Sequence, residues 1–226
     1  MMDRRTMIIA GLSALAGPAR SQVAPGAGEL AGYRGLHRAA HAGDVAEIRR
    51  LAAAGSDINA LDERRRTPLH VACYARKVEA MHALVAAGAN PRALEFQAYD
   101  CITIAAVADD LPTLKAAIAL GGNSREITSP YHGTALIAAA HLGHDGVVKT
   151  LIDAGAPLDH VNNLGWTALI EAVILGDGGP RHVETLRHLL QAGARRDIAD
   201  REGRTPLDHA RSRGYAAMVE LLSRSR

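Results

Sequence analysis

The sequence predicts an all-α solenoid of about six helix-turn-helix units with β-turn fingers, and three observations predict it. The segment Thr67-Pro68-Leu69-His70 recurs in related form at Thr134, Thr167 and Thr205, in register with a recurring glycine. Aromatic residues make up only 3% of the 226 residues, so small aliphatic side chains must fill any core. The glycine follows a leucine-rich stretch at spacings of 33, 33, 34 and 38 residues: Gly55, Gly88, Gly121, Gly155 and Gly193. Self-similarity at this period is typical of stacked repeats.

Each unit reads as a turn, a short alanine-rich helix, a reversal, a second helix and a glycine stop. Paired small residues in the first helix, such as Ala39-Ala40 and Ala139-Ala140, let neighbouring helices approach closely. Larger residues such as Leu84 and Leu151 fill the layer behind them. A single unit cannot bury its own apolar face, so stacking must supply the core. The predicted units are 29–61, 62–94, 95–128, 129–161, 162–199 and 200–226.

Residues 1–21 are expected to be an export signal, because Asp3-Arg4-Arg5 leads into the uncharged stretch from Thr6 to Ala19. The adjacent arginines resemble a twin-arginine signal, although the usual Phe-Leu-Lys tail is absent. Cleavage after Ser21 would leave residues 22–28 as a linker and place the mature protein in the periplasm or outside the cell. A cytoplasmic protein with a frayed tail is the alternative.

Removal of this segment makes the chain neutral, with 23 basic and 23 acidic residues, so the formal charge of +2 does not indicate a nucleic-acid partner. The sequence also has no apolar run near the ~18 residues that a membrane span needs. The remaining charge is uneven, because residues 95–180 hold ten Asp and Glu but only three Lys and Arg.

Two features depart from the regular unit. The last unit carries Arg211, Ser212 and Arg213 where internal copies are more apolar, which fits a solvated cap. Unit five contains an insertion between its two helices, expected either as a lip of the groove or as a tolerated surface loop. Its proline suits the first turn of the following helix. The insertion consists of Asp177, Gly178, Gly179, Pro180 and Arg181.

These residues resemble the ankyrin repeat, whose pattern runs Thr-Pro-Leu-His-x-Ala, then Gly-His, then Leu-Leu-x-x-Gly-Ala. The pattern stands in this chain at Thr67–Ala72, at Gly143-His144 and at Leu189–Ala194. The resemblance covers nearly all of the chain beyond the expected signal. It implies a protein-binding module without a cofactor, whose concave surface is made by finger tips and by the exposed sides of the first helices.

The resemblance also implies that partners touch places two, three, five, thirteen and fourteen of each unit. Six of the seven aromatic residues fall on these places, and only Tyr215 does not. Tyr33 and Tyr74 fit equally well as packing against the next finger. Tyr and Trp are typical anchors of binding sites, so Tyr99, Tyr131 and Trp166 are the stronger candidates.

The acidic bias of the middle units predicts a polar, aromatic-walled patch in units three to five, suited to a basic loop or helix of a protein partner. A solvated face is the alternative. Glu171 stands where units two and three have Val71 and Ile104, and a carboxylate there needs a partner or water. The candidate binding residues are Arg66, Phe96, Tyr99, Tyr131, His132, His141, Asn163, Trp166, Glu171 and Arg204.

No catalytic motif is present, so neither an enzyme nor a metal site is expected. His141 and His144 straddle Gly143, where histidine belongs to the repeat pattern. Cys73 and Cys101 occupy non-equivalent places in adjacent units and are expected as small buried side chains without a disulfide.

The leading hypothesis is an exported, monomeric, non-enzymatic module that binds a folded envelope protein. It would inhibit, protect or scaffold that partner. The second hypothesis is a small-molecule binder or enzyme with a pocket in units four and five around Glu171 and Trp166.

Overall fold

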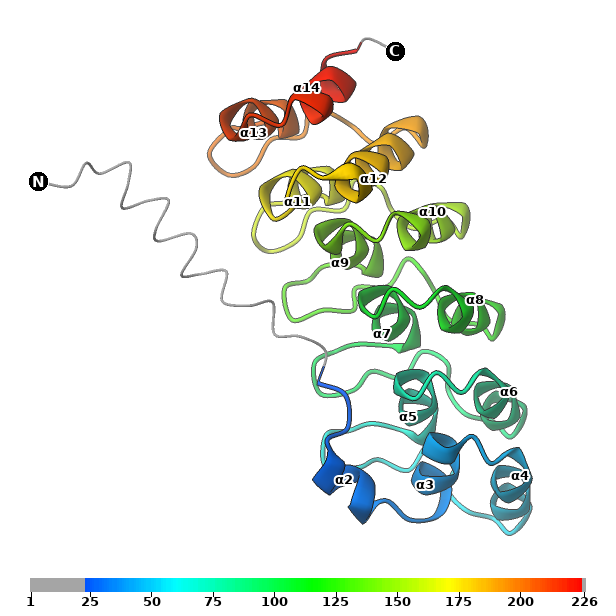
Figure 1. The fold of residues 1–226 in the computed structure, drawn as a ribbon. Helices are drawn as coiled ribbons and strands as arrows, with labels where there is room; N and C mark the ends of the chain where they lie inside the picture. Colours follow the sequence, from blue (N-terminus) through cyan, green and yellow to red (C-terminus); the bar gives the residue numbers. More distant parts are fainter. Residues whose placement is uncertain (1–22, 225–226) are drawn as a thin grey trace, which may run out of the picture.

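The computed structural model describes residues 23–224, which form thirteen helices, α2 to α14, and within that range no strand (Figure 1). The helices stack as pairs in sequence order, and the expected all-α solenoid of six units is confirmed. The first helices of the units are α3 (Gly35–Ala42), α5 (Pro68–Tyr74), α7 (Cys101–Val107), α9 (Ala135–Leu142), α11 (Ala168–Ile174) and α13 (Pro206–Arg213). The second helices are α4 (Val45–Ala53), α6 (Val78–Ala86), α8 (Leu111–Ala119), α10 (Asp145–Asp153), α12 (Pro180–Gln191) and α14 (Ala216–Ser223).

A side-chain oxygen caps the start of the first helix in units two to six. Each accepts a hydrogen bond from the backbone amide three residues further on, as Asp100 does from Thr103 at 2.8 Å. Such a cap satisfies one of the amides that the first turn of a helix leaves unpaired. The recurring threonine of the sequence pattern is therefore a helix cap, and its equivalents are Thr67, Asp100, Thr134, Thr167 and Thr205.

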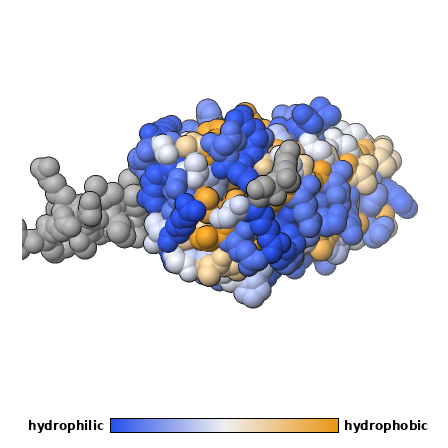
Figure 2. Space-filling model, turned by 90° about the horizontal axis from the view of Figure 1, so that it is seen from above, coloured by the Kyte–Doolittle hydropathy of each residue, from blue (hydrophilic) through white to orange (hydrophobic). Residues whose placement is uncertain are grey.

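The core is built from small and branched aliphatic side chains, as expected. The paired alanines, among them Ala39-Ala40 and Ala139-Ala140, are buried between the first helices of neighbouring units. Leu84 and Leu151 are fully buried in the layer of second helices. In the last unit, at the C-terminal end of the stack, Arg211, Ser212 and Arg213 are exposed. This end of the molecule, seen from above, is mostly hydrophilic (Figure 2).

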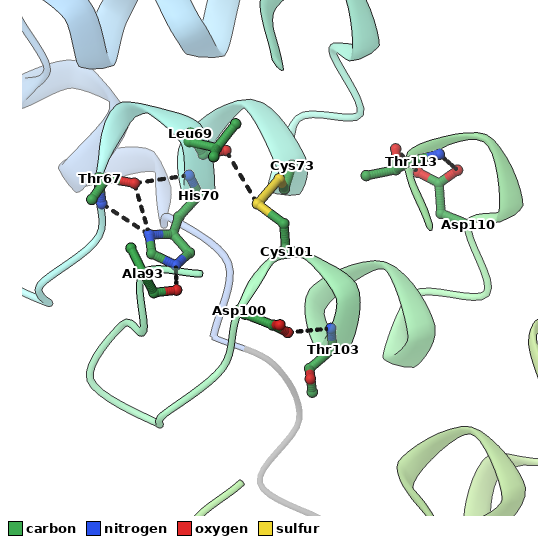
Figure 3. Close-up of a disulfide and its surroundings, with 10 residues drawn as sticks. All are labelled: Thr67, Leu69, His70, Cys73, Ala93, Asp100, Cys101, Thr103, Asp110 and Thr113. Atoms are coloured by element: carbon green, nitrogen blue, oxygen red, sulfur yellow. Dashed lines mark hydrogen bonds between the residues drawn. A yellow bond between two sulfur atoms is a disulfide. The ribbon is translucent and has the colours of Figure 1, made fainter. Parts of the chain in front are cut away.

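A disulfide joins Cys73 near the end of α5 to Cys101, the first residue of α7, with the two Cα atoms 5.8 Å apart (Figure 3). The expectation that these cysteines stay unpaired is therefore wrong, although both are buried as expected. Two positions that are not equivalent in the repeat can still lie close together in the fold. Leu69 and Cys73 lie one turn apart on the same side of α5, and Sγ of Cys101 lies 3.6 Å from the Leu69 carbonyl oxygen. The first turn of α7 thus packs against that side of α5.

The expected signal, residues 1–21, lies outside the described residues, but most of the expected linker does not. The boundary placed between residues 28 and 29 falls inside the short helix α2 (Ala27–Gly32). We call residues 23–32 the N-terminal strap. The strap lies on the side of the stack from which the finger loops project (Figure 1).

Candidate protein-binding surface

The fingers are turns closed by the side chain at place one of units two to six. That side chain accepts hydrogen bonds from the backbone amides two and four residues further on, at 2.8 to 3.2 Å. Because the same oxygen holds both amides, each finger has a fixed shape that presents places two to five in the same way. The closing residues are Asp62, Glu95, Ser129, Asn162 and Asp200.

Neighbouring finger tips are bonded in two pairs. The Phe96 amide donates to the Arg64 carbonyl at 3.1 Å, and the Asn163 amide donates to the Tyr131 carbonyl at 2.9 Å. Pro130 occupies the corresponding place in unit four and has no amide hydrogen to donate to finger three. The fingers of units two and three, and those of units four and five, are thus linked at their tips.

Exposed large hydrophobic side chains gather on these fingers. Of the eight that the described residues contain, only Leu142 at the end of α9 lies elsewhere. The other seven, which we call the finger row, are 40 to 56% exposed. Four stand one or two residues before a closing side chain and three stand at the tips: Leu61, Leu94, Ile127 and Val161, then Phe96, Tyr131 and Leu164.

Sequence reasoning found only two members of the finger row, Phe96 and Tyr131. Among the four that precede the fingers, the spacings of 33, 33 and 34 residues match the repeat period. An apolar residue repeated just before four of the turns is therefore a signal that the sequence contains.

Of the six aromatic rings placed on the predicted surface, only Phe96 and Tyr131 are exposed, and Tyr33 and Tyr74 follow the packing alternative. Tyr33 is buried, and its hydroxyl donates to Oδ2 of Asp62 at 2.7 Å. Tyr74, Tyr99 and Trp166 are half-buried. Tyr74 and Tyr99 pack against the core, because place five and the end of the first helix are close to the junction of finger and stack.

Arg66 is the clearest departure from the predicted binding surface. The expectation that it lies in the groove is wrong, because its side chain is 0% exposed beneath the N-terminal strap. Its Nε donates to Oδ2 of Asp62 at 2.8 Å, and its Nη2 pairs with Glu29 of α2. Arg64 also pairs with Glu29, at 3.0 Å, and its guanidinium lies 5.1 Å from the centre of the Phe96 ring. The strap therefore covers the finger of unit two with paired charges.

Glu171 is buried inside units four and five and does not line an open acidic patch. It is 5% exposed, and Asn162 donates to its Oε1 at 2.6 Å, which is the partner that the sequence required. Burial raises the pKa of Glu171 to about 8, although the Asn162 hydrogen bond opposes this. Nδ1 of His141 lies 3.6 Å from Oε2, and burial lowers the pKa of His141. Both shifts favour the neutral form of the group.

The remaining candidates have local partners. His132 is exposed at a left-handed turn position with φ of 54°, and its carbonyl lies 2.7 Å from Nε2 of His160. Asn163 is exposed, and its carbonyl accepts from Arg201. Arg204 is half-buried and donates to Oγ of Ser212 at 2.9 Å. These side chains stand at separate fingers and do not converge on one point.

The insertion in unit five is an ordered turn. Pro180 occupies the first turn of α12, as expected. Oδ1 of Asp177 accepts from the Gly179 amide at 2.8 Å. Arg181 pairs with Asp145 at 2.8 Å and with Asp109 at 2.9 Å, so it ties the insertion to units four and three.

The repeat histidines have structural roles. Nε2 of His70 lies 2.9 Å from the Ala93 carbonyl, and burial lowers the pKa of this histidine to about 4 (Figure 3). His144 contacts the Ala106 carbonyl at 2.9 Å. Among residues 23–224, no group of three His, Cys, Asp or Glu side chains is arranged to hold a metal ion. A helix able to span a bilayer is likewise missing from that part of the chain.

Two family models match the sequence. "Ankyrin repeats (3 copies)" matches residues 102–200, and "Ankyrin repeats (many copies)" matches residues 36–85. Among curated proteins, the ankyrin repeat protein YahD of Escherichia coli (strain K12) is 37% identical over 93 residues. That match covers 41% of this chain and 46% of YahD, so the chain spans less than half of that relative's length.

Solved structures match over most of the chain. An ankyrin repeat domain from Acinetobacter baumannii is 42% identical, with a TM-score of 0.78 over 83% of this chain and 95% of the domain. The ankyrin repeat protein EF0377 is 27% identical, with a TM-score of 0.78 over 86% and 100%. The ankyrin repeat domain of Bcl-3, a member of the IkappaB family, is 26% identical, with a TM-score of 0.75 over 84% and 85%.

Proposed function

The chain belongs to the ankyrin repeat family, and from this premise we propose that it is an exported module that binds a folded envelope protein through its fingers. Ankyrin repeats indicate protein–protein interaction, and the finger row is the observation that carries the proposal for this chain. Three of its apolar side chains stand exposed at the tips of turns of fixed shape, and the other four stand exposed just before these turns. An exposed apolar group arranged in this way marks an interaction site, because burying it against a partner removes apolar surface from water.

Two members of the row are suited to act as anchors. Phe96 and Tyr131 stand at the tips of fingers three and four, and aromatic side chains dominate the energetics of most interfaces. The partly exposed Arg64 guanidinium lies beside the Phe96 ring. We propose a partner that presents an apolar patch with acidic and basic side chains at its rim.

The disulfide supports export. Disulfides persist in oxidising compartments such as the bacterial periplasm and are rare in the cytosol. The Cys73–Cys101 bond and the signal-like residues 1–21 therefore favour the same compartment. In that compartment the module would act as a monomer, without catalysis, and would inhibit, protect or scaffold its partner.

The binding proposal is tested with matched variants. The mature chain captures its partner from the organism's own envelope fraction, and the affinity of the purified pair is then measured. Phe96→Ala with Tyr131→Ala should weaken binding at least tenfold. Leu142→Ala removes an exposed apolar side chain away from the fingers and should change nothing. Equal loss in both variants would refute the finger row as the docking site, and an affinity insensitive to salt would exclude charged rim contacts.

The export proposal is tested separately. Arg4→Lys together with Arg5→Lys should abolish transport, and persistence of the protein in the periplasmic fraction would show that the twin-arginine route is wrong. Alkylation of free thiols in intact cells gives a second readout. In the exported chain, Cys73 and Cys101 should resist alkylation. In a chain from which residues 1–21 have been deleted, both cysteines should react once the chain is denatured.

One observation favours the second candidate, a small-molecule site in units four and five. Asn162, Glu171 and His141 approach one another there. The Glu171 carboxyl is already buried and bonded to Asn162, so a ligand that binds this carboxyl would have to displace Asn162. A ligand screen by thermal shift tests this candidate, since a true hit should lose its effect in Glu171→Gln.

A further inference from the structure

The N-terminal strap is held on finger two by one carboxylate and one backbone unit. Oε1 of Glu29 accepts from Nε of Arg64 at 3.0 Å and also from Nη2 of Arg66. The carbonyl of Val23 accepts from Nη1 of Arg66 at 3.3 Å, and the amide of Val23 donates to Oε1 of Gln97 at 3.3 Å. Two of the three guanidinium nitrogens of Arg66 therefore bind the strap, and the third binds within finger two.

Little apolar surface secures this strap. None of the residues of α2 is buried, and Leu30 alone among them packs partly against the core. In Figure 1, α2 lies beside the finger loops and outside the stacked pairs of helices. The docked strap thus depends on polar contacts. Water can replace such contacts when the strap leaves, so their net contribution to docking is modest.

The sequence of the strap gives it no stable structure of its own. α2 has only six residues and two of them are glycines, which are poor helix formers. A helix this short is not stable in water without tertiary contacts. Oε2 of Glu29 accepts from the Gly26 amide at 2.8 Å and so caps α2, while Oε1 binds the two arginines. The same carboxylate therefore couples the folding of α2 to its docking.

The place that the strap covers is a carboxylate-binding site next to the finger row. The Arg66 side chain is 0% exposed under the strap, and the Arg64 guanidinium lies 5.1 Å from the centre of the Phe96 ring. Although burial opposes it, hydrogen bonds from the Gly26 amide and from Arg66 lower the pKa of Glu29. The site thus favours an ionised carboxylate, which arginine binds through strong charge-assisted hydrogen bonds.

We propose that Arg64 and Arg66 form a binding site for an acidic segment of the protein partner, and that the strap occupies this site until that segment displaces it. This proposal rests on the protein-binding function proposed above. A carboxylate of the partner takes the position of Glu29, while an adjacent apolar side chain packs on Phe96. The strap is tethered and therefore present at a high effective concentration. It outcompetes acidic segments that lack the apolar contact, so it favours partners that use both parts of the surface.

The site can be tested without the partner. The probe is a synthetic peptide of residues 23–32, acetylated at Val23 so that the amide of this residue is kept. The protein is the purified chain with Glu29→Gln, in which the strap has lost its charge. An NMR titration should show saturable binding, with shifts at the side-chain NεH of Arg66 and at the side-chain amide of Gln97. The peptide carrying Glu29→Gln should bind at least about tenfold more weakly.

Glu47→Gln is the matched control. Glu47 also lies in the first turn of a helix and pairs with an arginine, and its side chain is 29% exposed against 28% for Glu29. The strap of this variant is intact, so the peptide should bind it at least about tenfold more weakly than it binds the Glu29→Gln chain. No saturable binding to the Glu29→Gln chain would overturn the proposal, and so would equal binding to the two chains.

Hydrogen exchange in the parent chain gives a measurement that needs no variant. If the strap leaves by local opening, the α2 amides should exchange at least about 100-fold faster than the amides of α9 in the middle of the stack. Equal exchange rates in the two helices would mean that the strap leaves only when the whole chain unfolds. That result would overturn displacement even if Glu29→Gln failed to fold.

The captured partner supplies the last comparison. Glu29→Gln weakens the competing strap, so this variant should bind the partner about tenfold more tightly than Glu47→Gln does. Equal or weaker binding would overturn the proposal, because the strap would then be no competitor. Failure of the finger row is a separate result. It would appear as unchanged partner affinity in Phe96→Ala with Tyr131→Ala and would leave the peptide titration unaffected.

Discussion

Asn162 donates its side-chain amide to Oε1 of Glu171, nine residues further on, at 2.6 Å. Unit six has the equivalent contact between a different pair of side chains, because Nε2 of His209 lies 2.7 Å from Oδ2 of Asp200. In both units one atom of the closing side chain shapes the finger and the other satisfies a polar residue in the first helix. A polar residue is thus tolerated at this buried place where the finger supplies its partner.

Glu171 gives the protein a pH dependence that can be predicted. Its pKa rises from 4.5 to about 8 on folding because of burial, so the native state binds a proton that the unfolded state releases. The stabilisation of the native state by this bound proton is complete below about pH 4.5 and is lost as the pH rises towards about 8. Glu171→Gln keeps the neutral shape, so its melting temperature should exceed that of the parent increasingly between pH 5 and pH 9.

Melting curves followed by circular dichroism at pH 5, 7 and 9 measure this difference. Glu202→Gln removes an exposed carboxylate from the neighbouring finger and serves as the control, with no expected trend. A constant difference between Glu171→Gln and the parent at all three pH values would contradict the shifted pKa.

The disulfide should contribute substantially to stability. It closes a chain segment of 28 residues between Cys73 and Cys101 and restricts the unfolded state. The loop-entropy model gives about 3–4 kcal/mol for such a loop. Urea unfolding with and without reductant measures the loss, and the double variant Cys73→Ala with Cys101→Ala should not respond to reductant. An unchanged midpoint in the reduced parent would contradict this expectation.

Much of the fold was predictable because the repeat makes the same physical demands at each step. Thr67 and Thr167 recur because each first helix needs a cap, and Ala139-Ala140 recurs because helices must pack closely. The disulfide was not predictable from the register. Alignment compares equivalent places, whereas Cys73 and Cys101 meet through the offset between two neighbouring helices.

The candidate surface was predictable only in part. Phe96 and Tyr131 are exposed because their places stand at finger tips. Exposure of the other rings depends on which way a side chain turns, and the register does not determine that. Arg66 was misplaced for a different reason. Its cover comes from Glu29 and Val23, which lie more than thirty residues earlier in a segment without any repeat pattern.

The aromatic side chains should divide into two classes on substitution. Tyr99→Ala and Trp166→Ala remove half-buried rings and should each lower the free energy of unfolding by about 1–3 kcal/mol. Phe96→Ala and Tyr131→Ala remove exposed rings and should stay within about 0.5 kcal/mol. Urea titration of the four variants measures both classes. A stability loss at Tyr131 as large as that at Tyr99 would mean that the finger tip is part of the core.

Arg66 should be far more important for stability than Arg64, although both pair with Glu29. Arg66→Ala leaves Asp62 and Glu29 without their buried counter-charge and should cost about 3 kcal/mol or more. Arg64 is 41% exposed, so Arg64→Ala should cost less than about 1 kcal/mol. Arg66→Lys should restore little, because one ammonium cannot reach both carboxylates and the Val23 carbonyl. Equal losses at the two arginines, measured by urea unfolding, would contradict the buried role of Arg66.

The insertion can be tested with two glycines that share a backbone conformation. Gly178 and Gly203 have φ of 72° and 76°, so alanine is strained at both. The strain costs about 1 kcal/mol by itself. At Gly203 an added Cβ meets nothing within 4 Å, whereas at Gly178 it would lie 2.6 Å from the Tyr215 ring. That ring cannot withdraw freely, because its hydroxyl donates to the Gly176 carbonyl at 3.0 Å. Gly178→Ala should therefore cost about 2–3 kcal/mol against about 1 for Gly203→Ala, as measured by urea unfolding. Equal costs would mean that the insertion does not pack against the last unit.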